Sequence, residues 1–187
     1  PLLSFDRISA SILRRVRLLY MRRRYPGVKF GSRCDIRSGL HLALASNARV
    51  EFGSRCILDR EMTIECDGVL KVGARTVFGH HCTLAVRDSL LIGEDCLIAE
   101  MVSIRDHDHS FERLDVPTLQ QGMVSSPVLI GRNVWLGAKV TVVKGVEIGD
   151  NAVVGANAVV TKNIPANSIA VGVPARVVRF RTEPRKE

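Results

Sequence analysis

The sequence predicts an all-β solenoid in which the chain winds in triangular coils of three short strands each. Two observations predict this fold. An apolar residue returns every six positions, and its 18 occurrences form six groups of three: Phe30, Ile36, Leu42; Phe52, Leu58, Ile64; Val72, Phe78, Leu84; Ile92, Ile98, Ile104; Ile130, Leu136, Val142; and Ile148, Val154, Val160. Gly or Ala directly follows twelve of these 18 residues. One aliphatic side chain per strand would point inward, and the small residue would allow a tight corner, where positive φ is often needed.

The fifth position of each six-residue repeat, or hexad, must also be slim to fit inside a coil. It is occupied by cysteine or valine in seven hexads, at Cys34, Cys56, Cys82, Cys96, Val134, Val140 and Val146. The five cysteines are odd in number and contain no Cys-x-x-Cys pair, which argues against a disulfide framework or a zinc site. We therefore expect the cysteines to be small buried hydrophobic residues.

Before the first coil, residues 1–27 are expected to form a basic amphipathic helix. Apolar residues recur there at helical spacing and arginines are expected to face away from them; the apolar residues are Phe5, Ile8, Ile12, Val16 and Leu19, and the arginines are Arg7, Arg14 and Arg17. Two interpretations are open. The helix caps the open first coil, as solenoids require, or residues 4–24 touch an anionic membrane.

One long insertion interrupts the solenoid, which is expected to span residues 28–175. The first positions of successive groups lie 22, 20, 20, 38 and 18 residues apart. The 38-residue step contains an inserted loop at residues 105–128 that lacks the hexad pattern and carries His107 and His109. A long loop that leaves a rigid solenoid is usually functional. Residues 176–187 form a basic tail.

The charge is concentrated at the two ends of the chain. The net charge is +8, of which residues 1–29 carry +7 and residues 176–187 carry +3, while residues 30–175 carry −2. This distribution argues against a nucleic-acid-binding face. No apolar run approaches the ~18 residues of a membrane span. Arginines interrupt what would be a signal peptide, so we expect a cytoplasmic protein, peripheral to the membrane if the helix binds lipid.

Residues 28–180 resemble the hexapeptide-repeat acyltransferases, whose fold is a left-handed parallel β-helix. The resemblance is closest to the branch of maltose and galactoside O-acetyltransferases and bacterial polysaccharide O-acetyltransferases. Four segments carry it: residues 104–109 (IRDHDH), 127–146 (PVLIGRNVWLGAKVTVVKGV), 153–165 (VVGANAVVTKNIP) and 171–179 (VGVPARVVR). The histidine-bearing loop, the Trp135 hexad and the GVPAR ending together are more specific than the hexads alone.

The resemblance implies transfer of an acyl group, by default acetyl, from a coenzyme A thioester to a hydroxyl, with a loop histidine as general base. Imidazole suits this role because its neutral and protonated forms both exist near pH 7. The family places the base five residues after the last inward aliphatic residue, Ile104, which favours His109. His107 is the alternative, since both side chains face the same way in an extended segment. Asp106 or Asp108 would orient the imidazole.

The resemblance also implies acetyl-CoA contacts and no metal. Small residues would let the pantetheine arm lie close, and these are Ala138 and Ala156. Residues near the adenosine phosphates would be Thr161, Lys162, Arg176 and Arg179, of which the cations suit phosphate. Trp135 is expected to be a packing residue. The family is usually trimeric, with active sites between subunits, so a homotrimer is implied.

One departure bears on the acceptor. The galactoside and maltose enzymes carry an Asn-x-Asn stretch that helps bind sugar where this chain has Gly79-His80-His81, which points away from simple glycosides. Residues 108–111 (DHSF) and 120–122 (QQG) look more like members of polysaccharide pathways, which implies a surface-polysaccharide precursor. Transfer to an amino group remains an alternative to transfer to a hydroxyl, because the same fold serves both reactions. Two other classes also stay open. One is a metalloenzyme resembling the γ-carbonic anhydrases, although the expected histidine spacing is missing, and the other is a non-catalytic membrane- or partner-binding scaffold.

Overall fold

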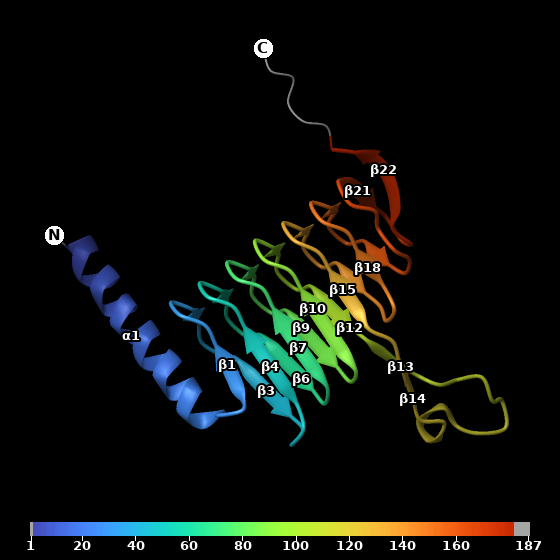
Figure 1. Cartoon of the computed structure of the whole chain (residues 1–187), viewed down its shortest axis with the longest axis horizontal. Coiled ribbons are helices and arrows are strands. Elements are labelled where there is room, and N and C mark those ends of the chain that lie inside the picture. The colour runs from blue at the N-terminus through green and yellow to red at the C-terminus, as the bar shows by residue number, and fades with distance from the viewer. Residues whose placement is uncertain (1, 182–187) are drawn as a thin grey trace, which may run out of the picture.

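A computed structural model describes residues 2–181, with side chains described from residue 12 onward. Helix α1 (Leu2–Arg24) lies at one end of a parallel β-solenoid, and the C-terminal strands lie at the other end (Figure 1). The chain passes repeatedly through three sheets, here named A, B and C, in that order. The solenoid has about seven turns, because sheet B holds seven strands paired in parallel and one paired antiparallel.

The strands are short and stack in sequence order within each sheet. Sheet A contains β1 (Val28–Phe30), β4 (Arg49–Phe52), β7 (Val69–Val72), β10 (Ser89–Ile92), β15 (Val128–Ile130) and β18 (Glu147–Ile148). Sheet B contains β2 (Asp35–Ile36), β5 (Ile57–Leu58), β8 (Val77–Phe78), β11 (Leu97–Ile98), β16 (Trp135–Leu136), β19 (Val153–Val154), β21 (Ser168–Val171) and β22 (Arg176–Phe180). Sheet C contains β3 (His41–Leu44), β6 (Thr63–Cys66), β9 (Thr83–Val86), β12 (Ser103–Arg105), β17 (Thr141–Val142) and β20 (Val159–Val160).

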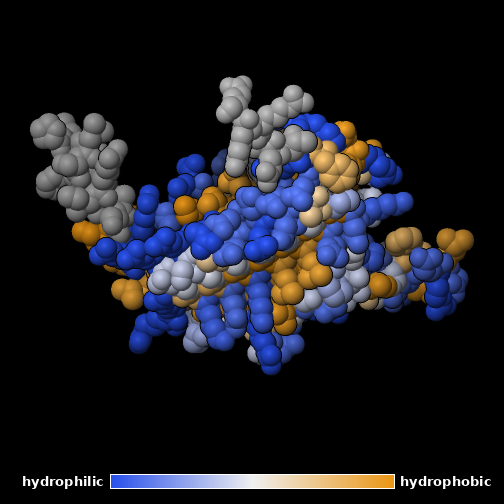
Figure 2. All heavy atoms as spheres, turned by 45° about the horizontal axis from the view of Figure 1, so that its top comes forward, coloured by the Kyte–Doolittle hydropathy of each residue, from blue (hydrophilic) through white to orange (hydrophobic). Residues whose placement is uncertain are grey.

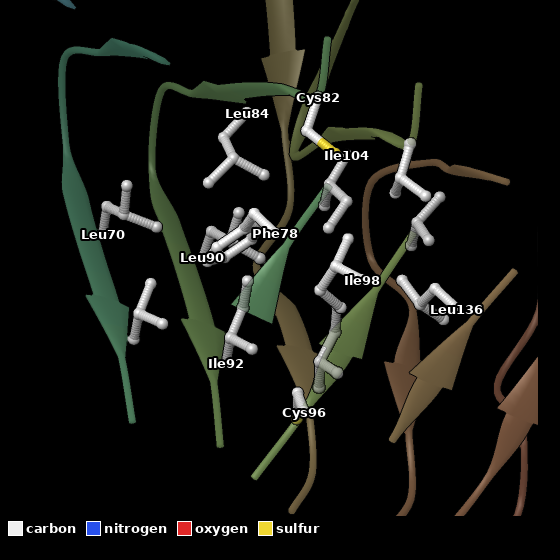
Figure 3. Close-up of a cluster of buried hydrophobic side chains, with 14 of the residues drawn as sticks. Leu70, Phe78, Cys82, Leu84, Leu90, Ile92, Cys96, Ile98, Ile104 and Leu136 are labelled. Carbon is white, nitrogen blue, oxygen red and sulfur yellow. The ribbon is translucent and has the colours of Figure 1, made fainter. Parts of the chain in front are cut away.

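The hexad register predicted from the sequence is confirmed. Each of the 18 apolar positions lies in a strand and is buried, with no more than 7% of its surface exposed. Consecutive coils pair these positions directly, as in the alignment of Leu58 with Phe78 and of Ile98 with Leu136. Their side chains fill the interior of the solenoid (Figure 3). The six-residue period therefore sets both the register and the core.

The physical reason for the small residue after each apolar position differs from the expected one. Positive φ occurs two residues later, where non-glycine residues such as Arg33, Arg55 and Asn133 adopt it. The small residue is needed because the next coil passes close by. A Cβ atom on Gly31 would lie 2.5 Å from the backbone of Gly53. Where this position is glycine, close stacking of coils, rather than a left-handed corner, excludes a side chain.

The cysteines have the structural role expected of them. All five are free and buried. The four that occupy fifth hexad positions point into the coil, as Figure 3 shows for Cys82 and Cys96. Burial raises the pKa of Cys82 to about 11 and also raises the pKa of Cys66 and Cys96. These three thiols are small apolar core residues rather than nucleophiles, whereas the side-chain hydrogen bond with Cys56 lowers the pKa of Cys34.

Helix α1 packs on the first coil through its arginine-bearing face. The sequence predicted contact through the opposite, apolar face. Met21 is buried, Arg17 donates a hydrogen bond to the carbonyl of Ile36, and Arg22 donates one to the carbonyl of Phe30. Arg14 forms an ion pair with Asp35. The predicted contact face was therefore wrong: its apolar residues with described side chains, Ile12, Val16 and Leu19, are exposed, while the side chains of Phe5, Arg7 and Ile8 are not among those described.

The long insertion and the chain end are more regular than the sequence suggested. The insertion leaves the solenoid after β12 as an antiparallel pair, β13 (His107–His109) and β14 (Met123–Ser125), joined by a loop with one 3₁₀ turn, η1 (Thr118–Gln120) (Figure 1). The expected basic tail begins with β22, which pairs antiparallel with β21. Among the described residues, no helix combines the length and apolarity that crossing a bilayer requires.

Candidate functional site

The point where the insertion leaves sheet C holds a buried aspartate paired with a histidine. The carboxylate of Asp106 accepts backbone hydrogen bonds from Arg87 (2.8 Å) and Asp88 (2.7 Å), which form the corner after β9 one coil earlier. Only 1% of Asp106 is exposed. Its Oδ1 also lies 2.9 Å from Nδ1 of His107. Because a carboxylate can only accept, Nδ1 of His107 donates, which leaves Nε2 with a free lone pair.

His107 borders an open hollow of mixed polar and apolar lining on the outer face of sheet C. The hollow has a volume of about 470 Å³. Its lining includes the charged residues Glu65, Asp67 and Arg87. The His107 side chain is 18% exposed, so it is accessible but held in place. The arrangement provides an oriented acceptor of protons next to a space with several hydrogen-bonding groups.

His109 lies two residues further along β13 and is not held in this way. It is exposed, and no hydrogen bond between described residues involves its ring. Asp108, between the two histidines, pairs with Lys144 at 2.6 Å and so links the hairpin to the next coil. The sequence register favoured His109, whereas the carboxylate partner is found at His107.

The two small residues assigned to the pantetheine arm lie in one groove. Ala138 and Ala156 occupy the same corner between sheets B and C on consecutive coils, and they line a groove of about 400 Å³ that is mostly apolar. Ala99 and Glu100 continue this groove one coil earlier. Trp135 forms part of the wall and is 50% exposed. Trp135 is therefore not part of the solenoid interior, where the inward position belongs to Leu136.

The four residues assigned to the phosphates lie on the last coil, beyond this groove. Thr161 and Lys162 directly follow β20 and are exposed. The amide of Ala175 donates to the carbonyl of Val159 at 2.8 Å, which brings the start of β22, and with it Arg176, next to β20. Arg179 lies further along β22, opposite Ile169, on the outer edge of sheet B. The start of β22 thus places Arg176 near Thr161 and Lys162. Arg179 lies three residues further along the same strand, away from these two residues.

The histidine pair that replaces the Asn-x-Asn stretch lies on the same corner as the apolar groove. His80 and His81 contact each other edge to face, with ring centroids 5.1 Å apart, beside Arg60 and Glu61. Nδ1 of His80 is buried without a hydrogen-bond partner among the described residues. The part of the chain with described side chains contains no group of three or more His, Cys, Asp or Glu residues placed to hold a metal ion.

His107 and the groove lie on opposite edges of sheet C. Glu100 aligns with Ala138, because the amide of Lys139 donates to the carbonyl of Glu100 and Ser103 pairs with Thr141. The seven residue steps from Glu100 to His107 cover at most about 23 Å, and strand β12 lies between the two edges. The groove runs from coil to coil, parallel to the other edge. A ligand that extends along this groove therefore comes no closer to His107 of the same chain.

Part of this site was visible in the sequence and part was not. The residue types and the hexad positions of Ala138 and Ala156 were sufficient to place them in one groove. The sequence left open whether Asp106 or Asp108 orients a histidine, because the donors that bury Asp106 belong to another coil. A signal existed in the alternation of β13, which puts Asp108 on the side opposite both histidines.

Comparison with known proteins identifies relatives for most of the solenoid. Residues 127–162 match the family model described as the hexapeptide repeat of succinyl-transferase. The chain is 40% identical over 119 residues to the putative lipopolysaccharide biosynthesis O-acetyl transferase WbbJ of Escherichia coli, covering 60% of this chain and 61% of that protein. It is 38% identical over 111 residues to the galactoside O-acetyltransferase of Escherichia coli, covering 59% of this chain and 53% of that protein.

A third relative and two solved structures extend the comparison. A probable acetyltransferase of Mycobacterium tuberculosis is 34% identical over 135 residues, covering 72% of this chain and 45% of that protein. The chain thus spans about half of the length of the curated relatives it matches. A galactoside acetyltransferase in complex with coenzyme A superimposes with a TM-score of 0.62 at 31% identity, over 78% of this chain and 66% of that chain. A hexapeptide-repeat acetyltransferase of Vibrio cholerae shares the fold, with a TM-score of 0.66 at 22% identity, over 91% of this chain and 82% of that chain.

The stacked hexads, the histidine-bearing insertion and the small residues of the groove occur here together with these similarities. The chain belongs to the hexapeptide-repeat acetyltransferase family and is similar to its galactoside O-acetyltransferases.

Proposed function

We propose that this protein transfers an acetyl group from acetyl-CoA to a hydroxyl of a sugar or surface-polysaccharide precursor, with His107 as general base. The observation that carries this proposal is the buried Asp106 carboxylate that fixes Nδ1 of His107 and leaves Nε2 free. A free imidazole nitrogen next to an open hollow that contains charged side chains is what abstraction of a hydroxyl proton requires. This choice departs from the family register, which favoured His109, because His109 has no comparable partner.

In the proposed reaction, Nε2 of His107 takes the proton of the acceptor hydroxyl as its oxygen attacks the thioester carbonyl. The C–S bond then breaks, and the proton passes from the imidazole to the leaving thiolate of coenzyme A. The Asp106 carboxylate keeps the imidazole in one tautomer and one orientation. The products are the acetyl ester and free coenzyme A, and no metal is needed in this sequence.

The donor is proposed to lie in the groove lined by Ala138 and Ala156. Its mostly apolar lining suits the pantetheine arm, and Lys162 and Arg176 on the last coil suit the phosphates. Coenzyme A is bound by the galactoside acetyltransferase that superimposes on this chain. Since the groove and His107 lie on opposite edges of sheet C, we propose a homotrimer. Each active site would then combine His107 of one copy with the groove of the next.

The acceptor is proposed to be a polyhydroxylated molecule that contacts both copies. The hollow beside His107 supplies Glu65, Asp67 and Arg87 as hydrogen-bonding groups. Exposed His81, beside Arg60 and Glu61, supplies a further polar contact on the corner that carries the donor groove. The similarity to the putative lipopolysaccharide biosynthesis O-acetyl transferase WbbJ supports a surface-glycan precursor. The five free thiols agree with a cytoplasmic reaction.

Donor binding is tested by calorimetric titration with acetyl-CoA and with CoA. We expect one site per chain, and we expect Ala138→Tyr to abolish binding because the new ring would fill the groove. Ala74→Tyr is the matched control, since Ala74 occupies the same hexad position, after Gly73, on a different corner. Failure of the unaltered protein to bind at millimolar ligand would refute the transferase and favour a scaffold.

The base is tested by acetyl-CoA turnover with a panel of glycoside and oligosaccharide acceptors. We expect His107→Ala to lower kcat by about 10²–10⁴-fold, the usual contribution of a general base, without weakening acetyl-CoA binding. His109→Ala should change kcat by only a few fold. The opposite result would assign the base to His109, as the family register does, and would overturn our choice.

A further inference from the structure

The face of α1 that points away from the solenoid is apolar and unpartnered. With 3.6 residues per turn, Ile12, Val16 and Leu19 lie on one side of the helix, and Tyr20 borders them, opposite the buried Met21. These four side chains are 57%, 56%, 63% and 61% exposed. Figure 2 shows hydrophobic surface beside the grey N-terminal atoms at this end of the molecule. The stripe is continuous over the described helical side chains, unlike scattered single apolar residues.

The charges around this stripe are all positive. Residues 12–24 contain six arginines and no acidic residue. Arg14, Arg17 and Arg22 are directed to the first coil by the contacts described above. Arg15, Arg23 and Arg24 are exposed, and the guanidinium of Arg24 also lies over the ring of Tyr25, 5.0 Å from its centroid. Helical geometry puts Arg15 and Arg24 on the two flanks of the stripe and Arg23 at its C-terminal end.

An apolar stripe surrounded by positive charge favours one kind of binding partner. A second copy of the helix would place arginines against arginines around the apolar stripe, which is unfavourable. A membrane-crossing role does not fit either, because α1 lacks the required apolar length. A surface that is apolar below and negatively charged above matches both features, since the apolar side chains enter the acyl boundary while the arginines meet anionic headgroups.

We propose that the outward face of α1 docks this protein on an anionic lipid bilayer, with the helix lying in the plane of the interface. The residues that insert are Ile12, Val16, Leu19 and Tyr20, and the residues that contact headgroups are Arg15, Arg23 and Arg24. The face turned to the first coil fixes the solenoid on the bilayer, because Arg14, Arg17, Met21 and Arg22 hold the helix to it. This inference does not depend on the chemistry proposed for His107.

The test is sedimentation of the full chain with vesicles of phosphatidylcholine alone or with roughly 30 mol% phosphatidylserine. We expect binding to the mixed vesicles only, with release in about 0.5 M NaCl. The double variant Arg15→Gln/Arg23→Gln should bind about 25-fold more weakly, because each basic residue near an anionic surface strengthens binding roughly fivefold. Val16→Asp/Leu19→Asp should lower binding by more than about 100-fold.

The matched control is Leu91→Asp/Leu129→Asp, which places two acids on paired, exposed leucines of sheet A. That face is not part of the proposed interface between copies, so this control should bind vesicles nearly as well as the unaltered chain. Circular dichroism and light scattering verify that all variants keep the fold and oligomeric state. If Val16→Asp/Leu19→Asp instead lowers the oligomeric state, or if binding is equal to both kinds of vesicle, the proposal is wrong.

Discussion

Replacing Asp106 with asparagine separates the positioning of His107 from the rest of the site. The substitution keeps the shape of the side chain but leaves one oxygen acceptor where the carboxylate has two. In the structure, Oδ1 accepts from the Arg87 amide and from Nδ1 of His107, and Oδ2 accepts from the Asp88 amide. In either orientation of the new amide, its NH₂ group faces the partly buried backbone N–H of Arg87 or Asp88. One donor must remain unsatisfied, and the other bonds lose their charged acceptor.

The size of the effect follows from these contacts. A buried donor left without a partner costs about 1–3 kcal/mol, and the loss of charge assistance in the remaining bonds adds about 1 kcal/mol. We therefore expect Asp106→Asn to lower the free energy of unfolding by about 2–4 kcal/mol. Because the imidazole loses its fixed tautomer, kcat should fall by about 10²-fold or more. The KM for acetyl-CoA should not change, since the groove lies on the other edge of sheet C.

The assay combines urea unfolding followed by circular dichroism, at fixed protein concentration, with turnover measured under conditions where the variant is folded. Asp108→Asn is the control, because Asp108 is half exposed and its pair with Lys144 should contribute less than about 1 kcal/mol. If Asp106→Asn loses stability but keeps the kcat of the unaltered protein, Asp106 is structural only. The assignment of His107 as an oriented base would then be refuted.

Three further predictions test the core, the thiols and the acid response. Phe78→Ala should lower the free energy of unfolding by about 3–5 kcal/mol, because Phe78 is fully buried, whereas Leu97→Ala on the exposed side of β11 should cost far less. Titration with a disulfide reagent should find no reactive cysteine in the native protein and five after unfolding in denaturant. Thermal midpoints should be level between pH 7 and 5 and fall below about pH 4, because the hydrogen bonds from Arg75 to Asp95, and from the backbone amide and side chain of Arg132 to Asp150, lower the pKa of these carboxyls.

Each of these three predictions can be contradicted by one result. Equal losses for Phe78→Ala and Leu97→Ala would contradict the inward register of sheet B. A thiol that reacts in the native protein would contradict the burial of the cysteines. The pH prediction depends on the direction of the pKa shift. A carboxyl whose pKa is lowered by folding stabilises the protein above its unfolded pKa, and this stabilisation is lost as the pH falls through the folded pKa. Stability that rises on acidification would contradict the arginine pairs.

The sequence alone determined the solenoid and the register of its interior. The hexad is a local signal, because each inward side chain and the small residue after it recur every six positions whatever the neighbouring coils contain. The buried cysteines and the shared corner of Ala138 and Ala156 follow from the same count. The start of the long insertion was equally visible, since the pattern stops after Ile104 and resumes at Ile130.

Only the tertiary structure decided which histidine is oriented and which face of α1 is free. Asp106 is fixed by amides of Arg87 and Asp88, which lie 18 or 19 residues earlier and become neighbours only when coils stack. The face of α1 is decided by Asp35 and by carbonyls at the open end of the first coil, which attract arginines where an apolar contact was expected. Polar groups at the end of a solenoid have no coil to pair with, so they take hydrogen bonds from side chains, and the apolar stripe of the helix turns outward.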